Sequence, residues 1–254
     1  MAEVLQPPDY LSASSMTTFL QCPLKFKFSR IDRIKEPATE PMILGSFVHE
    51  ILEEFYKASA DERTFDTARS IGRDLWDSKW AKEADEVGVR DINQFRWKAW
   101  WCIENLFTLE DPQQMNLAGV ETKVDDTING VRVLGFVDRY LHDDDGNVVV
   151  ADYKTGKVPL PKWSADKVFQ IMVYVLMLEQ MLEQPVVSGE IIYLKEGKVV
   201  AYEPTQKRRS ETIQTITSVR KEVEDSCEAG AFQTKPSRLC DWCHYKPICP
   251  AWAK

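Results

Sequence analysis

The chain has 254 residues, 44% of them hydrophobic, which is enough to bury the core of one large domain or two small ones. No apolar run approaches the roughly 18 residues of a membrane span, and the N-terminal sequence lacks the layout of a signal peptide. We therefore expect a cytoplasmic protein that does not contact membranes. The net charge of −8 argues against non-specific coating of nucleic acid, but it is compatible with an enzyme that has a local basic groove.

The first 110 residues are predicted to be mainly helical. A short helix is expected to end near Cys22, and the stretch GSFVHEILEEFYKAS, which contains His49, has the apolar spacing of an amphipathic helix. Two further helices are expected at 67–84 and 93–109. The second of these carries three tryptophans that we expect to pack in the core rather than to stack on bases: Trp97, Trp100 and Trp101.

Strand patterns begin near residue 117. Residues 117–157 alternate apolar and polar side chains around two turn signals, which predicts a three-stranded antiparallel meander. A long apolar helix at 166–183, a second hairpin at 189–204 and a charged helix at 207–228 are expected to follow. This order predicts a mixed α/β fold built as a single domain over 1–254. Its parts are a helical N-terminal part (1–110), a sheet-and-helix core (111–204), and a C-terminal helix with a cysteine knuckle (205–254).

Carboxylates and a lysine follow two of the predicted strands. Asp138 comes after the apolar run RVLGFV, and Asp152 and Lys154 come after VVVA. Side chains two apart in a strand share a face, and pairing through the DDDG turn would bring Asp138 near Asp152. Two carboxylates on one face can hold Mg²⁺ or Mn²⁺, and a lysine beside them can position a water. The alternative is a surface Asp–Lys pair among ordinary turn residues.

Two other positions are candidates for the same site. Gln170 and Tyr174 are four residues apart on the long apolar helix, so they share a face, and a polar pair there needs partners. His49 lies on a helix that could cover the sheet. The alternatives are a core tyrosine with a rim glutamine, and a structural histidine.

Taken in chain order, four blocks of the sequence resemble the motifs of the PD-(D/E)XK nuclease superfamily, specifically its RecB-type exonuclease branch. The blocks are Gly45-x-x-x-His49, Gly135-Phe136-Val137-Asp138-Arg139, Asp152-Tyr153-Lys154-Thr155-Gly156 and Gln170-x-x-x-Tyr174. The resemblance implies a restriction-endonuclease-like core, with a central mixed sheet flanked by helices. It also implies hydrolysis of DNA phosphodiester bonds with one or two Mg²⁺ or Mn²⁺ ions.

The resemblance also implies roles for individual residues. The residues implied to bind the metal are His49, Asp138, Asp152 and the backbone carbonyl of Tyr153. Lys154 would help to activate or orient the attacking water. Gln170 and Tyr174 would lie beside the site and contact DNA or orient their neighbours. Glu121 falls where relatives often carry a glutamate, and we expect it to be an accessory residue at most.

The cysteines suggest a second metal site. Three of them lie within the last fifteen residues, as Cys240, Cys243 and Cys249, and Cys22 lies near the other end of the chain. Some nucleases of this branch, including CRISPR-associated ones, are similar here and bind a [4Fe-4S] cluster with one early and three late cysteines. Four thiolates also suit Zn²⁺, but the uneven spacing favours the cluster. Cys102 is expected in the core.

Two classes of function follow. The first is a stand-alone, metal-dependent deoxyribonuclease, an exonuclease that acts on DNA ends or single strands. The second is a non-catalytic DNA-binding or adaptor subunit of a recombination or CRISPR-adaptation complex. The presence of every expected ligand and of Lys154 favours the enzyme. Action on RNA or on another phosphodiester is a third possibility, and the oligomeric state is open.

Overall fold

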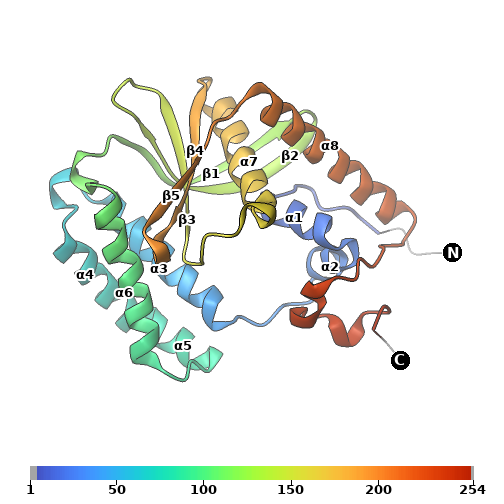
Figure 1. The fold of residues 1–254 in the computed structure, drawn as a ribbon. Helices are drawn as coiled ribbons and strands as arrows, with labels where there is room; N and C mark the ends of the chain where they lie inside the picture. The colour runs from blue at the N-terminus through green and yellow to red at the C-terminus, as the bar shows by residue number, and fades with distance from the viewer. Residues whose placement is uncertain (1–4, 253–254) are drawn as a thin grey trace. The chain divides into compact units, whose positions relative to one another are not determined.

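A computed structural model describes residues 5–252 of the chain. Its helices and strands are α1 (Ala13–Gln21), α2 (Pro23–Phe26), α3 (Glu40–Lys57), α4 (Phe65–Leu75), α5 (Ala81–Val87), α6 (Ile92–Leu109), β1 (Leu117–Ile128), β2 (Val131–His142), β3 (Val148–Lys154), α7 (Ala165–Leu182), β4 (Val186–Tyr193), β5 (Lys198–Tyr202) and α8 (Gln206–Glu228). Figure 1 shows these elements in chain order from blue to red. The order matches the predicted sequence of a helical front, a strand-rich middle crossed by a helix, and a helical tail.

The chain divides into two compact units, each built from segments that are distant in the sequence. One, the sheet unit, comprises Ala38–Lys123 and Phe136–Pro204. The other, the terminal unit, comprises Met1–Pro37, Val124–Gly135 and Thr205–Lys254. These boundaries differ from the consecutive parts expected from the sequence, because β1 and β2 each contribute residues to both units. The assignment of the whole chain to a single domain stays a prediction.

The strands form one mixed five-stranded sheet in the order β1-β2-β3-β4-β5. Strand β3 pairs antiparallel with β2 and parallel with β4, and β4 pairs antiparallel with β5. Parallel neighbours need a long crossover connection, and α7 supplies it between β3 and β4. The predicted meander and second hairpin are confirmed, and so is the mixed α/β fold with helices flanking the sheet.

Helices cover both faces of the sheet within the sheet unit. On one face, Tyr153 of β3 and Leu194, directly after β4, join a core of aromatic side chains from α3 and α6, including Phe47, Phe55 and Phe95. On the other face, α7 packs against β3 and β4 (Figure 1). Successive side chains of a strand point to opposite faces of the sheet. Every second residue of β3 therefore lies in the aromatic core, and the residues between them face α7.

One prediction for the helical part needs correction. The helix expected at 67–84 is present, with a π-helical segment at Trp76–Trp80 between α4 and α5. Of the three tryptophans expected in the core, Trp97 is 59% exposed and Trp101 is 41% exposed. Their rings stack on each other at a centroid distance of 5.6 Å on the outer surface of α6. The spacing of apolar residues does not show which of these tryptophans are buried, because α6 carries large aromatic residues around most of its circumference. The core position of Cys102 is confirmed.

In the terminal unit, the two ends of the chain are joined by hydrogen bonds. The backbone N–H of Leu24 donates to the carbonyl of Gln233, and the hydroxyl of the buried Tyr245 donates to the carbonyl of Ile34 at 2.9 Å. Lys235 donates to the carbonyl of Leu20. The segments that carry the early and the late cysteines therefore belong to one packed unit. Among the described residues, no helix is both long and apolar enough to cross a membrane.

Candidate metal centre

The two aspartates singled out in the sequence lie on neighbouring strands of the sheet unit. Arg139 of β2 pairs with Ala151 of β3, so one step further along the register Asp138 stands opposite Asp152. Both aspartates are buried, at 8% and 2% exposure. Asp138 Oδ2 accepts a hydrogen bond of 2.7 Å from the backbone N–H of Tyr153, which fixes its carboxylate against β3. The strands thus bring together two acidic groups that are costly to bury without a counter-charge.

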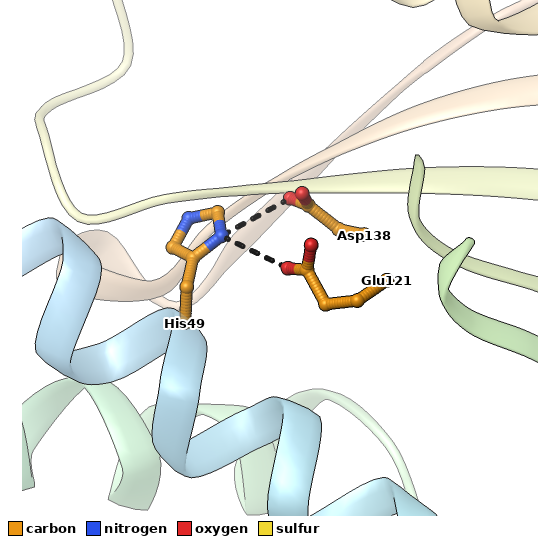
Figure 2. Close-up of side chains that lie close together, drawn as sticks. All are labelled: His49, Glu121 and Asp138. Atoms are coloured by element: carbon orange, nitrogen blue, oxygen red, sulfur yellow. Dashed lines mark ion pairs between the residues drawn. The ribbon is translucent and has the colours of Figure 1, made fainter. Parts of the chain in front are cut away.

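His49 and Glu121 complete a group of possible metal ligands with Asp138. Figure 2 shows the His49 ring, carried by α3, pointing at both carboxylates. Its Nδ1 lies 3.5 Å from Asp138 Oδ2 and 3.8 Å from Glu121 Oε1. One ligand atom from each of the three residues lies within 4.8 Å of the others. The second ring nitrogen, Nε2, is 3.1 Å from the backbone carbonyl of Tyr153. One nitrogen and several oxygens therefore converge on a small volume.

Glu121 owes its position to an irregular backbone. Its φ is +42°, in the left-handed region that a residue with a bulky side chain rarely adopts. Two residues earlier, a Cβ on Gly119 would lie 2.0 Å from Tyr140 Cε1, so only glycine fits there. A non-glycine residue held in this region costs about 1–3 kcal/mol, and such strain gathers at functional sites. The irregular backbone turns Glu121 toward His49, whereas the sequence predicted it only as an accessory residue.

Charges of both signs surround Asp152. Lys154 Nζ lies 2.6 Å from Asp152 Oδ2, although that buried oxygen accepts no hydrogen bond of good geometry. The side-chain amide of Gln170 donates to Asp152 Oδ1 at 3.2 Å and to the hydroxyl of Tyr174 at 3.1 Å. The structure therefore brings Lys154, Gln170 and Tyr174 to Asp152, as their spacing suggested. Asp152 lies outside the closest group of ligand atoms, and its role as a metal ligand stays a prediction.

The protonation of these groups reflects a site built to hold positive charge. Burial alone would lower the pKa of His49, but Asp138 and Glu121 outweigh it and raise that pKa to about 10. Burial and the charge of Asp138 raise the pKa of Asp152 to about 6, against the opposing pull of Lys154 and His49. A proton on His49, and below about pH 6 one on Asp152, reduces the repulsion among these carboxylates.

The free energy of unfolding should depend on pH differently in wild type and in a variant that lacks the buried Asp152 carboxylate. Its pKa of about 6 in the folded protein lies above its ordinary value of 3.8. Between these two pH values the folded state holds a proton that the unfolded state has lost. The free energy of unfolding of the metal-free protein therefore rises as the pH falls through 6. We expect wild type to gain stability relative to Asp152→Asn between pH 7 and pH 4.5 in urea unfolding with chelator. Equal pH dependence in both proteins would contradict the assignment.

Sequence reasoning missed a buried ion pair behind the site. Arg139 is 1% exposed, and its two terminal nitrogens donate to the two oxygens of Glu110 at 2.6 and 2.9 Å. Arg139 also donates to the hydroxyl of Tyr56 at 3.0 Å and lies over the rings of Tyr56 and Tyr153. This pair supports the strand segment whose other face carries Asp138. The signal in the sequence was an arginine beside Asp138, which strand alternation turns into the core.

The four cysteines thought to hold a cluster line a single pocket in the terminal unit. The residues are Cys22, Cys240, Cys243 and Cys249. The backbone N–H of Ser237 donates to Cys240 Sγ at 3.4 Å. Among the residues described, no three cysteine sulfurs lie within 4.8 Å of one another. The cysteines therefore share one cavity but are not drawn into a tight tetrahedral group.

Known proteins are similar to this chain over nearly its whole length. A sequence model described as the PD-(D/E)XK nuclease superfamily matches residues 10–250. Two curated relatives are each named Gene 69 protein, from Mycobacterium phages L5 and D29. This chain is 23% identical to the first over 289 aligned residues and 24% identical to the second over 273, with 95% of this chain and 96% of each relative covered.

A similar solved structure adds support for the fold. It is that of a protein from Eubacterium rectale named as a candidate exonuclease, and it matches with a TM-score of 0.64. The alignment covers 95% of this chain and 89% of that one, at 13% sequence identity. At this identity the likeness establishes a shared fold and nothing more specific.

Proposed function

Because the chain belongs to the PD-(D/E)XK nuclease superfamily, we propose that it is a metal-dependent deoxyribonuclease that hydrolyses phosphodiester bonds at DNA ends or in single strands. The observation that carries the proposal is the convergence of His49, Glu121 and Asp138 next to the Asp152–Lys154 pair. Cation ligands next to a lysine can support hydrolysis of an anionic phosphodiester, because both the cation and the lysine stabilise negative charge that develops on the phosphate. Action at ends is what the resemblance of the four motif blocks to the RecB-type exonucleases implies.

Mg²⁺ or Mn²⁺ suits the ligand atoms in this site. Both ions prefer oxygen ligands, and Mn²⁺ also accepts an imidazole. Asp138, Glu121 and His49 would hold the first ion. The buried Oδ2 of Asp152, which accepts no good hydrogen bond, and the carbonyl of Tyr153 beside His49 are the other ligands we propose. The sequence assigned Glu121 a lesser role than this.

The chemistry is divided between the ion and the protein. When bound, the divalent cation neutralises charge on the scissile phosphate and lowers the pKa of a coordinated water. Lys154, 2.6 Å from Asp152, is placed to orient the attacking water and to stabilise negative charge as it develops. Gln170 holds Asp152 in position through one hydrogen bond and is itself held by Tyr174. Gln170 and Tyr174 are therefore proposed to position the carboxylate.

The function can be tested on end-labelled substrates. We expect wild type to degrade single- or double-stranded DNA with Mn²⁺ or Mg²⁺, and a chelator to stop the reaction. RNA of the same sequence, added as a competitor, tests the substrate class. Binding of DNA without any metal-dependent cleavage would contradict the proposal and would favour the non-catalytic adaptor. The cytoplasmic location and the recombination or CRISPR-adaptation partners predicted from the sequence stay predictions.

The four cysteines are proposed to bind a [4Fe-4S] cluster in the terminal unit. They line one pocket, and an N–H group donates to one of the sulfurs, as is common for iron–sulfur ligands. The distribution of the cysteines along the chain, one early and three late, favours a cluster over Zn²⁺, although four thiolates suit either. The role of the cluster would be to crosslink the early and late segments of the unit.

Removing one of these cysteines should therefore affect colour and stability together. We expect protein purified without oxygen to be brown and to contain four iron atoms per chain. Cys22→Ser should lose the colour and unfold at lower denaturant concentration, because a crosslink between distant segments is broken. Cys102→Ser, which alters a buried cysteine outside the pocket, should keep the colour. Colourless wild type with one zinc per chain would contradict the cluster and leave the nuclease proposal standing.

A further inference from the structure

The segment that follows β3 carries an unusual concentration of positive charge. Residues 154–167, KTGKVPLPKWSADK, contain four lysines and one aspartate, whereas the chain as a whole has a net charge of −8. The segment begins with Lys154 at the metal centre and runs into α7, whose Gln170 returns to Asp152. Both of its ends are thus fixed beside the carboxylates of the candidate metal centre.

Two exposed lysines of this segment form no ion pair with the residues that the structure describes. Lys157 and Lys162 are exposed, and among the described residues neither lies within 4.0 Å of a carboxylate. In contrast, most lysines of the sheet unit form ion pairs, as Lys57, Lys79 and Lys98 do. Unpaired lysines next to an active site are available to an anionic ligand.

An aromatic ring lies among these lysines. Trp163 is 67% exposed, and the Nζ of Lys162 lies 5.3 Å from the centre of its ring. Other tryptophans of the chain are also exposed, so what distinguishes Trp163 is its place among the lysines of this segment. An exposed ring beside positive charge is the arrangement by which proteins bind single-stranded nucleic acid, through base stacking and contacts to phosphates.

Lys167 connects the segment to the catalytic groups. Burial, together with the charge of Lys154, lowers its pKa, and Asp152 acts in the opposite direction. Lys167 is therefore within electrostatic reach of both residues. In contrast, a cavity lined by His49 and Glu121 carries three more glutamates and a single lysine, Lys79: the glutamates are Glu50, Glu53 and Glu54. The lysine segment therefore supplies positive charge that an anionic strand can use at a centre rich in carboxylates.

From this arrangement we infer that residues 155–167 bind single-stranded DNA next to the scissile phosphate. Trp163 stacks on an unpaired base, and Lys157 and Lys162 contact the flanking phosphates. This inference rests on the proposed function, and it names the form of substrate that the centre receives. A base inside a duplex has both faces covered by its neighbours, so stacking on Trp163 selects single strands and frayed ends.

The test separates base stacking from charge. Two fluorescent single-stranded oligonucleotides are compared: an intact strand and a strand whose nucleotides lack bases. The affinity for each is measured by fluorescence anisotropy in the presence of Ca²⁺. Wild type should bind the intact strand about tenfold more tightly, and Trp163→Ala should remove that difference. Trp163→Phe should keep most of it. Trp97→Ala, which removes a ring of similar exposure on α6, should bind like wild type.

The lysines give a second, independent readout. Replacing Lys157 and Lys162 by alanine should weaken binding to both strands and reduce the slope of log affinity against log salt by about 1.4. If wild type cleaves DNA but binds both strands equally, or if Trp163→Ala keeps the preference for bases, the inference fails and the proposed nuclease stands. If wild type neither binds nor cleaves DNA, both fail.

Discussion

Asp138→Asn is expected to lower the rate of metal-dependent DNA hydrolysis by at least about 10³-fold while the protein stays folded. The amide oxygen of asparagine can still accept the hydrogen bond from Tyr153 N–H that Asp138 Oδ2 accepts at 2.7 Å. The substitution therefore removes the negative charge that a cation needs and retains the contact that the strand needs. Single-turnover rates on labelled DNA with Mn²⁺, and circular dichroism of both proteins, measure the two effects.

A matched control is available on the same hairpin. Asp144 lies in the exposed turn between β2 and β3, and Asp144→Ala should retain wild-type activity. Comparing the two variants separates the effect of losing a carboxylate at the metal centre from the effect of losing one negative charge anywhere on the protein. An Asp138→Asn protein that hydrolyses DNA within tenfold of the wild-type rate would exclude Asp138 as a ligand.

Arg139→Met is expected to decrease the free energy of unfolding by about 3–5 kcal/mol. The substitution leaves Glu110, 15% exposed, without the two hydrogen bonds that Arg139 donates to it. A buried carboxylate without its partner costs more than the pair contributes, because its desolvation is no longer offset. Urea unfolding of metal-free protein at constant pH measures the change.

The double variant Arg139→Met with Glu110→Leu supplies the control. Both charges are then absent, so the loss of stability should be clearly smaller than the sum of the two single losses. Additive losses would mean that the two side chains do not form the coupled pair seen in the structure. A decrease below about 1 kcal/mol for Arg139→Met alone would show that water, or the Tyr56 hydroxyl that already donates to Glu110, compensates for the loss of the arginine.

The part of the site that the sequence predicted follows from simple periodicity. Alternation along β3 put Asp152 and Lys154 on one face, and the short turn after β2 brought Asp138 across from them. The four-residue spacing of Gln170 and Tyr174 placed both on the same face of α7. These relations depend only on regular strands and helices, so they can be read without knowledge of the tertiary structure.

Other parts depend on irregular backbone or distant packing. Glu121 reaches His49 because its backbone adopts φ +42°, and alternation assigns no such kink to a strand. Glu110 meets Arg139 because the end of α6 comes close to β2, a contact between residues 29 apart in the chain. Exposure of Trp97 and Trp163 also depends on which helix or loop covers them, and composition alone does not determine that.

The most direct measurement of the central claim is Mn²⁺-supported digestion of end-labelled DNA by Asp152→Ala. Asp152 is the residue that Lys154 and Gln170 both contact, so its loss removes a carboxylate of the proposed centre and both of these contacts. We predict that wild type degrades the DNA, and that the variant, folded by circular dichroism, leaves it intact over the same period. Near-normal digestion by Asp152→Ala would contradict a nuclease centre built on Asp138, Asp152 and Lys154.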